Sequence, residues 1–65
     1  MISIKKVPIE LAGCRLDKAS AELFSDFSRT QIKKWIIGGR ILVNGDLGQP
    51  KELVQEEDSI EINPV

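Results

Sequence analysis

Apolar residues at helical spacing follow Ser28 and predict a short helix that ends at a glycine pair. Ser28 and Gln31 have the spacing of a capping box, in which the hydroxyl accepts from a free helix N–H and the amide reaches back. Gly38-Gly39 supplies a left-handed position, which glycine adopts without a Cβ clash. The apolar stripe of this helix consists of Ile32, Trp35 and Ile36, and we expect all three, including the single tryptophan, to lie in the core.

A hairpin and a closing strand are predicted after this helix. Ile41–Val43 is a run of strand-forming residues, and Asn44-Gly45 is a strong short-range signal for a tight hairpin turn. The return strand is expected at Asp46–Gly48. Ser59–Asn63 alternates apolar and polar residues, which predicts the last strand.

The N-terminal part predicts a strand followed by a helix. Residues 1–10 alternate apolar and polar side chains with one slip at Lys5-Lys6, and the apolar positions are Ile2, Ile4, Val7 and Ile9. Pro8 fits only an edge strand or the end of a strand, because it lacks an N–H. Arg15–Phe24 predicts a helix whose inner stripe consists of Leu16, Ala19, Leu23 and Phe24. Phe27, just before the Ser28 cap, has the position of a hydrophobic staple.

These elements together predict a single α+β domain over residues 1–65. Two consecutive short helices would pack on a small, mainly antiparallel sheet of about three to five strands. Leu53 and Val54, between the hairpin and the last strand, are expected to add to the core. The chain shows no repeat, low-complexity segment or linker that would mark a second domain.

The composition argues against several classes of function. The chain has no histidine and a single cysteine, Cys14, which leaves no common general base, no internal disulfide and no structural metal site. No run approaches the ~20 apolar residues of a membrane span, and the N-terminus lacks the apolar core of a signal peptide. We therefore expect a cytoplasmic monomer without metal or cofactor, and without catalytic residues of its own.

The net charge of −1 conceals a strong asymmetry along the chain. Residues 1–45 contain eight Lys and Arg against four Asp and Glu, whereas residues 46–65 contain one Lys against six acids. Because phosphates are contacted over a local patch, this split matters more than the total charge. It predicts a polarised molecule with one face that attracts anions and an acidic end that faces away.

Four motifs follow one another in a specific order. They are Gly13-x-Arg15-Leu16-Asp17-Lys18, Ser28-Arg29-Thr30-Gln31-Ile32, Ile36-x-x-Gly39-Arg40-Ile41-x-Val43-Asn44-Gly45 and Asp58-x-Ile60-x-Ile62. In this order they resemble the S-four RNA-binding domain, also called the alpha-L motif, over residues 13–63. The resemblance implies a module that binds structured RNA.

A narrower resemblance concerns the leading strand, the segment Phe24–Arg29 and the loop Pro50-Lys51. These are similar to the N-terminal domain of large-subunit ribosomal RNA pseudouridine synthases, which docks RNA while a separate catalytic domain isomerises uridine. The resemblance therefore implies a targeting domain for ribosomal RNA whose catalytic domain is absent from this chain. A free-standing relative acting in ribosome or RNA metabolism is the alternative.

Asp17 is not expected to be catalytic. The catalytic motif of those synthases also contains Arg-Leu-Asp, but here the preceding His and the following Thr-Ser-Gly are missing. We expect Asp17 to be a helix-start acid favoured by the macrodipole, or an ion-pair partner of Arg29. Two departures from the family pattern, Asp46 after the hairpin turn and Glu57 in place of the usual Gly before Asp58, predict weaker RNA affinity and a strained last turn.

Ser28 and Arg29 are the leading candidates for contacting RNA. A helix N-terminus offers free N–H groups and a positive dipole end, and arginine adds a planar, bidentate donor. Lys33 lies one turn along the same flank, and Lys34 lies further round. The resemblance adds four further RNA-binding candidates in the first helix and the hairpin: Arg15, Lys18, Arg40 and Asn44. Clustered cations predict salt-sensitive binding to a structured RNA, in which the protein contacts mainly the phosphates.

Two functions of other classes stay open. A protein-interaction module would use the acidic sheet face and would have no affinity for RNA. A ubiquitin-like sulfur carrier is suggested by the length and by Ile41–Gly45, but such carriers need a C-terminal Gly-Gly, and this chain ends Asn63-Pro64-Val65.

Overall fold

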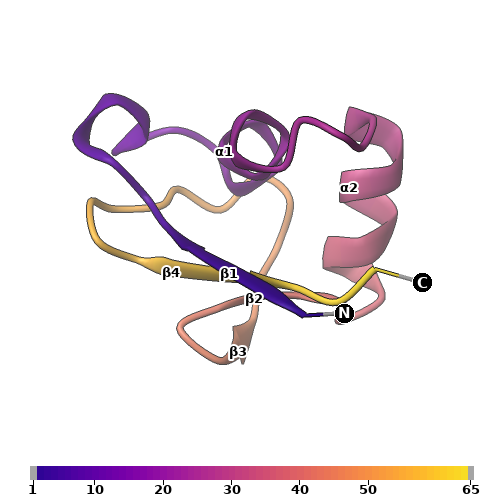
Figure 1. Cartoon of the computed structure of the whole chain (residues 1–65). Coiled ribbons are helices and arrows are strands. Elements are labelled where there is room, and N and C mark those ends of the chain that lie inside the picture. The colour runs from indigo at the N-terminus through magenta and orange to yellow at the C-terminus, as the bar shows by residue number, and fades with distance from the viewer. Residues whose placement is uncertain (1, 65) are drawn as a thin grey trace.

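A computed structural model describes residues 2–64 of the chain. The elements in chain order are β1 (Ser3–Lys6), the 3-10 turn η1 (Ile9–Leu11), α1 (Leu16–Leu23), α2 (Arg29–Ile37), β2 (Ile41–Val43), β3 (Asp46–Leu47) and β4 (Ser59–Ile62). Figure 1 shows α1 and α2 on the same side of the sheet, with α1 seen nearly end-on. This confirms the predicted α+β fold of two consecutive helices on a small antiparallel sheet.

The sheet has the order β1-β4-β2-β3, and every neighbouring pair is antiparallel. Alternate residues of β2 and β4 face the helices, so that Ile41, Val43, Ile60 and Ile62 are buried. The core also takes residues from both helices and three connecting segments: Val7, Leu16, Ala19, Phe24, Ile32, Trp35, Ile36 and Val54. The opposite face of the sheet is not covered, and Ile4 and Leu47 on it are exposed.

Local signals hold α2 at both ends. Ser28 Oγ accepts a hydrogen bond from the backbone N–H of Gln31 at 3.2 Å, but no bond returns from the Gln31 amide, so only half of the predicted capping box forms among residues 2–64. At the other end Gly39 has φ +81°, and the N–H groups of Gly39 and Arg40 donate to the carbonyls of Ile36 and Trp35. This pair of bonds is a Schellman motif, as the glycine pair predicted.

The hairpin turn has the left-handed geometry that its sequence predicts. Asn44 and Gly45 have φ values of +53° and +84°, the signs required by a tight two-residue turn. The Asn44 side chain is used internally, because its Nδ2 donates to Asp58 Oδ1 at 3.1 Å and its Oδ1 accepts from the Ser59 N–H at 2.9 Å. The turn is thereby tied to the start of β4.

The strand predicted within residues 1–10 forms over Ser3–Lys6, but most apolar residues of this segment lie outside the core. Ile2, Ile4 and Ile9 are exposed, and of the four apolar positions only Val7 is buried. The cause is register: β1 pairs with β4 so that Lys5 lies opposite the core residue Ile60, which leaves Ile4 on the uncovered face. A lysine can face the core here because β1 is an edge strand. The Lys5 side chain runs along the border of the core, where its Nζ lies 5.5 Å from the Phe24 ring centroid and donates to the Leu23 carbonyl.

Two further core expectations need adjustment. Val54 is buried, but its neighbour Leu53 is 59% exposed, so only one of the pair reaches the core. In α1, the side chains of Asp17 and Ser20 are fully buried beside the predicted apolar stripe, although both residues are polar. Phe27 packs edge-on against Trp35 with ring centroids 4.8 Å apart, so its ring contacts α2 further along than the helix start where a staple was predicted.

Substitution by glycine is expected to change the free energy of unfolding in opposite directions at the two non-glycine residues that have a left-handed backbone. Glu57 has φ +73°, and its side chain makes only an exposed ion pair among residues 2–64, so Glu57→Gly should raise the free energy of unfolding by about 0.5–1 kcal/mol. Asn44→Gly should lower it by about 1–2 kcal/mol, because two side-chain hydrogen bonds are lost. Urea unfolding followed by tryptophan fluorescence measures both. Equal signs for the two variants would contradict this account of the turns.

Candidate nucleic-acid interface

The first turn of α1 is closed by the loop that leads to β4. The N–H groups of Leu16 and Asp17 donate to the carbonyls of Glu52 and Pro50 at 2.6 and 3.0 Å. The N–H of Lys18 donates to Asp17 Oδ1 at 2.7 Å. Because these donors are occupied, the start of α1 can offer side-chain charge to a ligand but few free N–H groups.

The buried carboxylate of Asp17 gathers three cations. Its Oδ2 lies 3.2 Å from Arg15 Nη2, 3.6 Å from Arg29 Nη2 and 3.9 Å from Lys33 Nζ. The Asp17 side chain is 0% exposed, whereas the three basic side chains are each about half exposed. We call Asp17, Arg15, Arg29 and Lys33 the basic cluster.

The basic cluster presents net positive charge to solvent. Three cations around one carboxylate leave two positive charges uncompensated, and each cation keeps donors that the carboxylate does not use. Arg29 and Lys33 stand one turn apart on the flank of α2 that meets α1. Arg29 also stands at the helix start, where the N–H groups of Arg29 and Thr30 find no acceptor among residues 2–64. The arrangement can bind phosphate through charge and N–H donors together.

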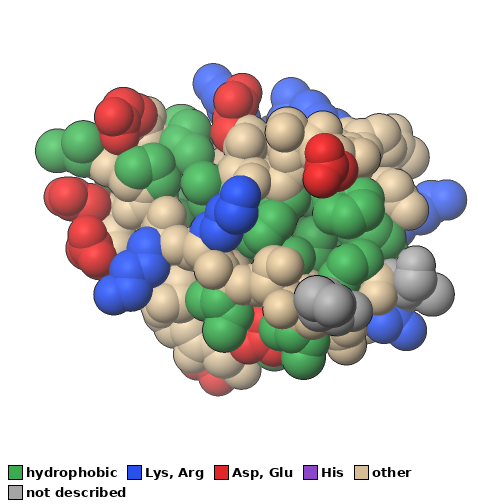
Figure 2. Space-filling view, viewed as in Figure 1, with side chains coloured by type: hydrophobic (Ala, Val, Ile, Leu, Met, Phe, Trp, Pro, Cys, Tyr) green, Lys and Arg blue, Asp and Glu red, His purple; other side chains and the backbone are tan. Residues whose placement is uncertain are grey.

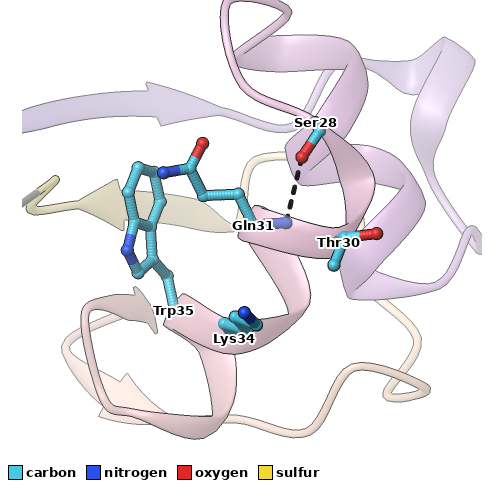
Figure 3. Close-up of a pocket in the computed structure, with 5 residues that line it drawn as sticks. All are labelled: Ser28, Thr30, Gln31, Lys34 and Trp35. Carbon is cyan, nitrogen blue, oxygen red and sulfur yellow. Dashed lines mark hydrogen bonds between the residues drawn. The ribbon is translucent and has the colours of Figure 1, made fainter.

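Lys18 and Lys34 lie near this cluster but outside it. Lys18 is exposed and has no ion-pair partner among the described residues. Lys34 lies further round α2, where it borders an open hollow of about 290 Å³. Figure 3 shows Lys34 and Thr30 along one side of this hollow and Trp35 and the Gln31 side chain on the other, with Ser28 at the helix start. Lys34 therefore belongs to a different flank of α2 from Arg29.

Arg40 and Asn44 stand apart from the helix starts. Arg40 follows the C-terminal end of α2, and its Nη1 donates to the Asn63 carbonyl at 3.3 Å. The side chain of Asn44 makes the two internal hydrogen bonds of the hairpin turn. The structure thus brings together Arg15, Arg29 and Lys33, and it assigns the Asn44 amide to folding.

Lys51 is a basic residue that sequence reasoning did not select. It follows Pro50, whose carbonyl accepts from the Asp17 N–H, so its backbone lies at the start of α1 beside the basic cluster. Lys51 comes close to the cluster only through the tertiary contact between this loop and α1, which the sequence does not show. On the face drawn in Figure 2, red side chains gather at the left end with a blue one beside them, and blue side chains predominate along the upper and right margins.

Other kinds of site find little support in residues 2–64. They contain no group of three or more His, Cys, Asp or Glu side chains arranged to hold a metal ion. Neither helix in that range has the length and apolar character needed to cross a membrane. Cys14 is a free, half-buried thiol.

Comparison with known families gives a match over most of the chain. The family model described as "S4 domain" matches residues 14–60, which contain both helices, the hairpin and the start of β4. This is the family that the motif order in the sequence resembled.

Curated relatives carry the same region at high identity. The chain is 52% identical over 52 residues to ribosomal large subunit pseudouridine synthase D of Escherichia coli O157:H7, and 50% identical over 52 residues to the protein of that name from Salmonella typhimurium. Each alignment covers 78% of this chain and 16% of the relative. The synthase D of Vibrio cholerae is 60% identical over 35 residues, which are 54% of this chain and 11% of that protein. The chain therefore spans about a sixth of the length of the first two.

Removal of one cation from the basic cluster should cost little stability. Arg29→Ala and Lys33→Ala are each expected to lower the free energy of unfolding by less than about 1 kcal/mol, because both side chains are half exposed and two cations still face Asp17. Urea unfolding tests this. A markedly larger loss would mean that the variant cannot serve in binding studies.

Proposed function

Because the chain belongs to the S4 domain family, we propose that it binds structured RNA and that the basic cluster is the centre of the contact. The single observation that supports this most is the convergence of Arg15, Arg29 and Lys33 on one buried carboxylate, with half of each side chain open to solvent. Free N–H groups at the start of α2 add donors at the same place.

The recognition we propose is of shape and backbone rather than of base sequence. Duplex RNA offers phosphates and 2′-hydroxyls, which arginine and lysine contact without reading bases. The single tryptophan is 8% exposed and packs on Phe27, so it offers no open face for stacking. Binding therefore depends on the arrangement of cations.

The biological target we propose is ribosomal RNA, with this chain acting as the docking part of a pseudouridine synthase. Support comes from the relatives, which are named as synthases of the large ribosomal subunit. In this role the chain supplies affinity and no chemistry. Asp17 fits it, because a carboxylate that is 0% exposed and surrounded by cations cannot reach a uridine.

A titration at several salt concentrations tests the proposal. The 65-residue chain is titrated into a fluorescein-labelled stem-loop of large-subunit ribosomal RNA. Fluorescence anisotropy is recorded at KCl concentrations from about 50 to about 200 mM. Three phosphate contacts predict a slope of about −3 for log affinity against log salt. Absence of binding at the lowest salt, or a flat dependence, would refute the proposal and favour a protein-interaction module.

Three single substitutions, each of which removes one positive charge, locate the surface that contacts RNA. Lys33→Ala should reduce the slope by about one unit, since it removes one phosphate contact. Lys34→Ala, on the outer flank of the same helix, should have a smaller effect. Lys6→Ala removes an exposed lysine whose Nζ lies 3.6 Å from Glu57 Oε2, and it should leave affinity nearly unchanged. Equal effects of the three would place the site elsewhere or show that only total charge matters.

A further inference from the structure

We propose that Asp17, although negatively charged, is a positioning residue for RNA binding, because it holds Arg15, Arg29 and Lys33 in the geometry that phosphates contact. The proposal rests on the proposed function and adds the reason why three cations stay together on this surface. It is carried by the three distances of 3.2, 3.6 and 3.9 Å to a single oxygen and by the burial of that carboxylate.

The carboxylate is fixed independently of the cations. Oδ1 accepts from the Lys18 N–H at 2.7 Å, and the backbone of Asp17 itself is tied to Pro50 by the N–H bond of 3.0 Å. These bonds hold Oδ2 toward the three basic side chains, which cover it. An oxygen held in this way can define where flexible basic side chains rest.

The cations need such an anchor because they repel one another. All three nitrogens lie within 3.9 Å of one oxygen, so they are closer together than the Debye length of about 8 Å at physiological salt. Without the carboxylate, long basic side chains spread into solvent, and each must then be ordered again when RNA binds. Asp17 makes this ordering part of folding.

Only the carboxylate can satisfy both sides of the site. Its Oδ1 accepts from the Lys18 N–H on one side, and its Oδ2 accepts from the Arg15 guanidinium and pairs with Arg29 and Lys33 on the other. An asparagine has the same shape but one acceptor oxygen and one NH₂ group, so it must turn a donor toward one of these donors. Asp17→Asn therefore loosens the cluster with a minimal change of volume.

The sign of the effect separates positioning from simple charge. Removal of a negative charge next to bound phosphates strengthens RNA binding if only charge matters. Positioning predicts the reverse. We expect Asp17→Asn to bind the ribosomal stem-loop about tenfold more weakly than the unaltered chain, once the folded fraction has been measured and corrected for.

Glu22→Gln is the matched control. It removes one negative charge from an exposed position of the same helix, α1, and should leave affinity unchanged or raise it slightly. Weaker binding by Asp17→Asn with equal or tighter binding by Glu22→Gln supports the proposal. Equal or tighter binding by the folded Asp17→Asn variant overturns it while the unaltered chain still binds. Failure of the unaltered chain to bind refutes the proposed function instead.

A measurement on the unaltered chain keeps the proposal testable if Asp17→Asn fails to fold. Nitrogen-15 relaxation of the side-chain Nε–Hε groups reports the order of each arginine in the free protein. Arg15 and Arg29 are expected to have order parameters above about 0.6, the usual limit for a flexible group. Values well below this limit would show that Asp17 does not hold the guanidinium groups and would overturn the proposal.

Discussion

The buried carboxylate of Asp17 is the interaction around which the two helices and the C-terminal loop are arranged. An ionised carboxylate taken out of water is costly unless charged and N–H donors surround it. Here these donors come from the first turn of α1 and from the exposed flank of α2. The loop at Pro50 adds an acceptor, because its carbonyl takes the hydrogen bond of the Asp17 N–H. The basic cluster on the surface therefore forms only when folding brings these segments together.

The local elements could be predicted because few neighbouring residues determine them. The Ser28 cap, the left-handed Gly39 and the Asn44-Gly45 turn all formed where their sequence signals stood. The pairing of β1 could not be predicted in the same way. Its register is decided by β4, more than fifty residues later, and the alternation of residues 1–10 does not say which face of the sheet Ile4 takes.

The candidate site was predictable as a set of charges but not as an arrangement. Sequence spacing put Arg29 and Lys33 on one flank, and Asp17 was a possible partner for Arg29. It could not show that Arg15 shares the same oxygen, or that a loop at Pro50 closes the start of α1. Such contacts depend on how the two helices cross. The Asn44 amide was likewise a candidate on sequence, yet the fold uses it.

The strand order β1-β4-β2-β3 places the last strand of the chain between the first strand and the hairpin. Figure 1 shows that the start of β1 and the end of β4 therefore lie at the same end of the sheet, where Ser3 is paired with Ile62. During synthesis, β1 has no partner until residues 59–62 have left the ribosome. Until then the nascent chain can form its helices and hairpin, but its core lacks Ile60 and Ile62 and its sheet lacks the strand that joins β1 to β2. The sheet therefore closes only after β4 has been translated, and before that point unpaired strand edges and apolar surface are exposed.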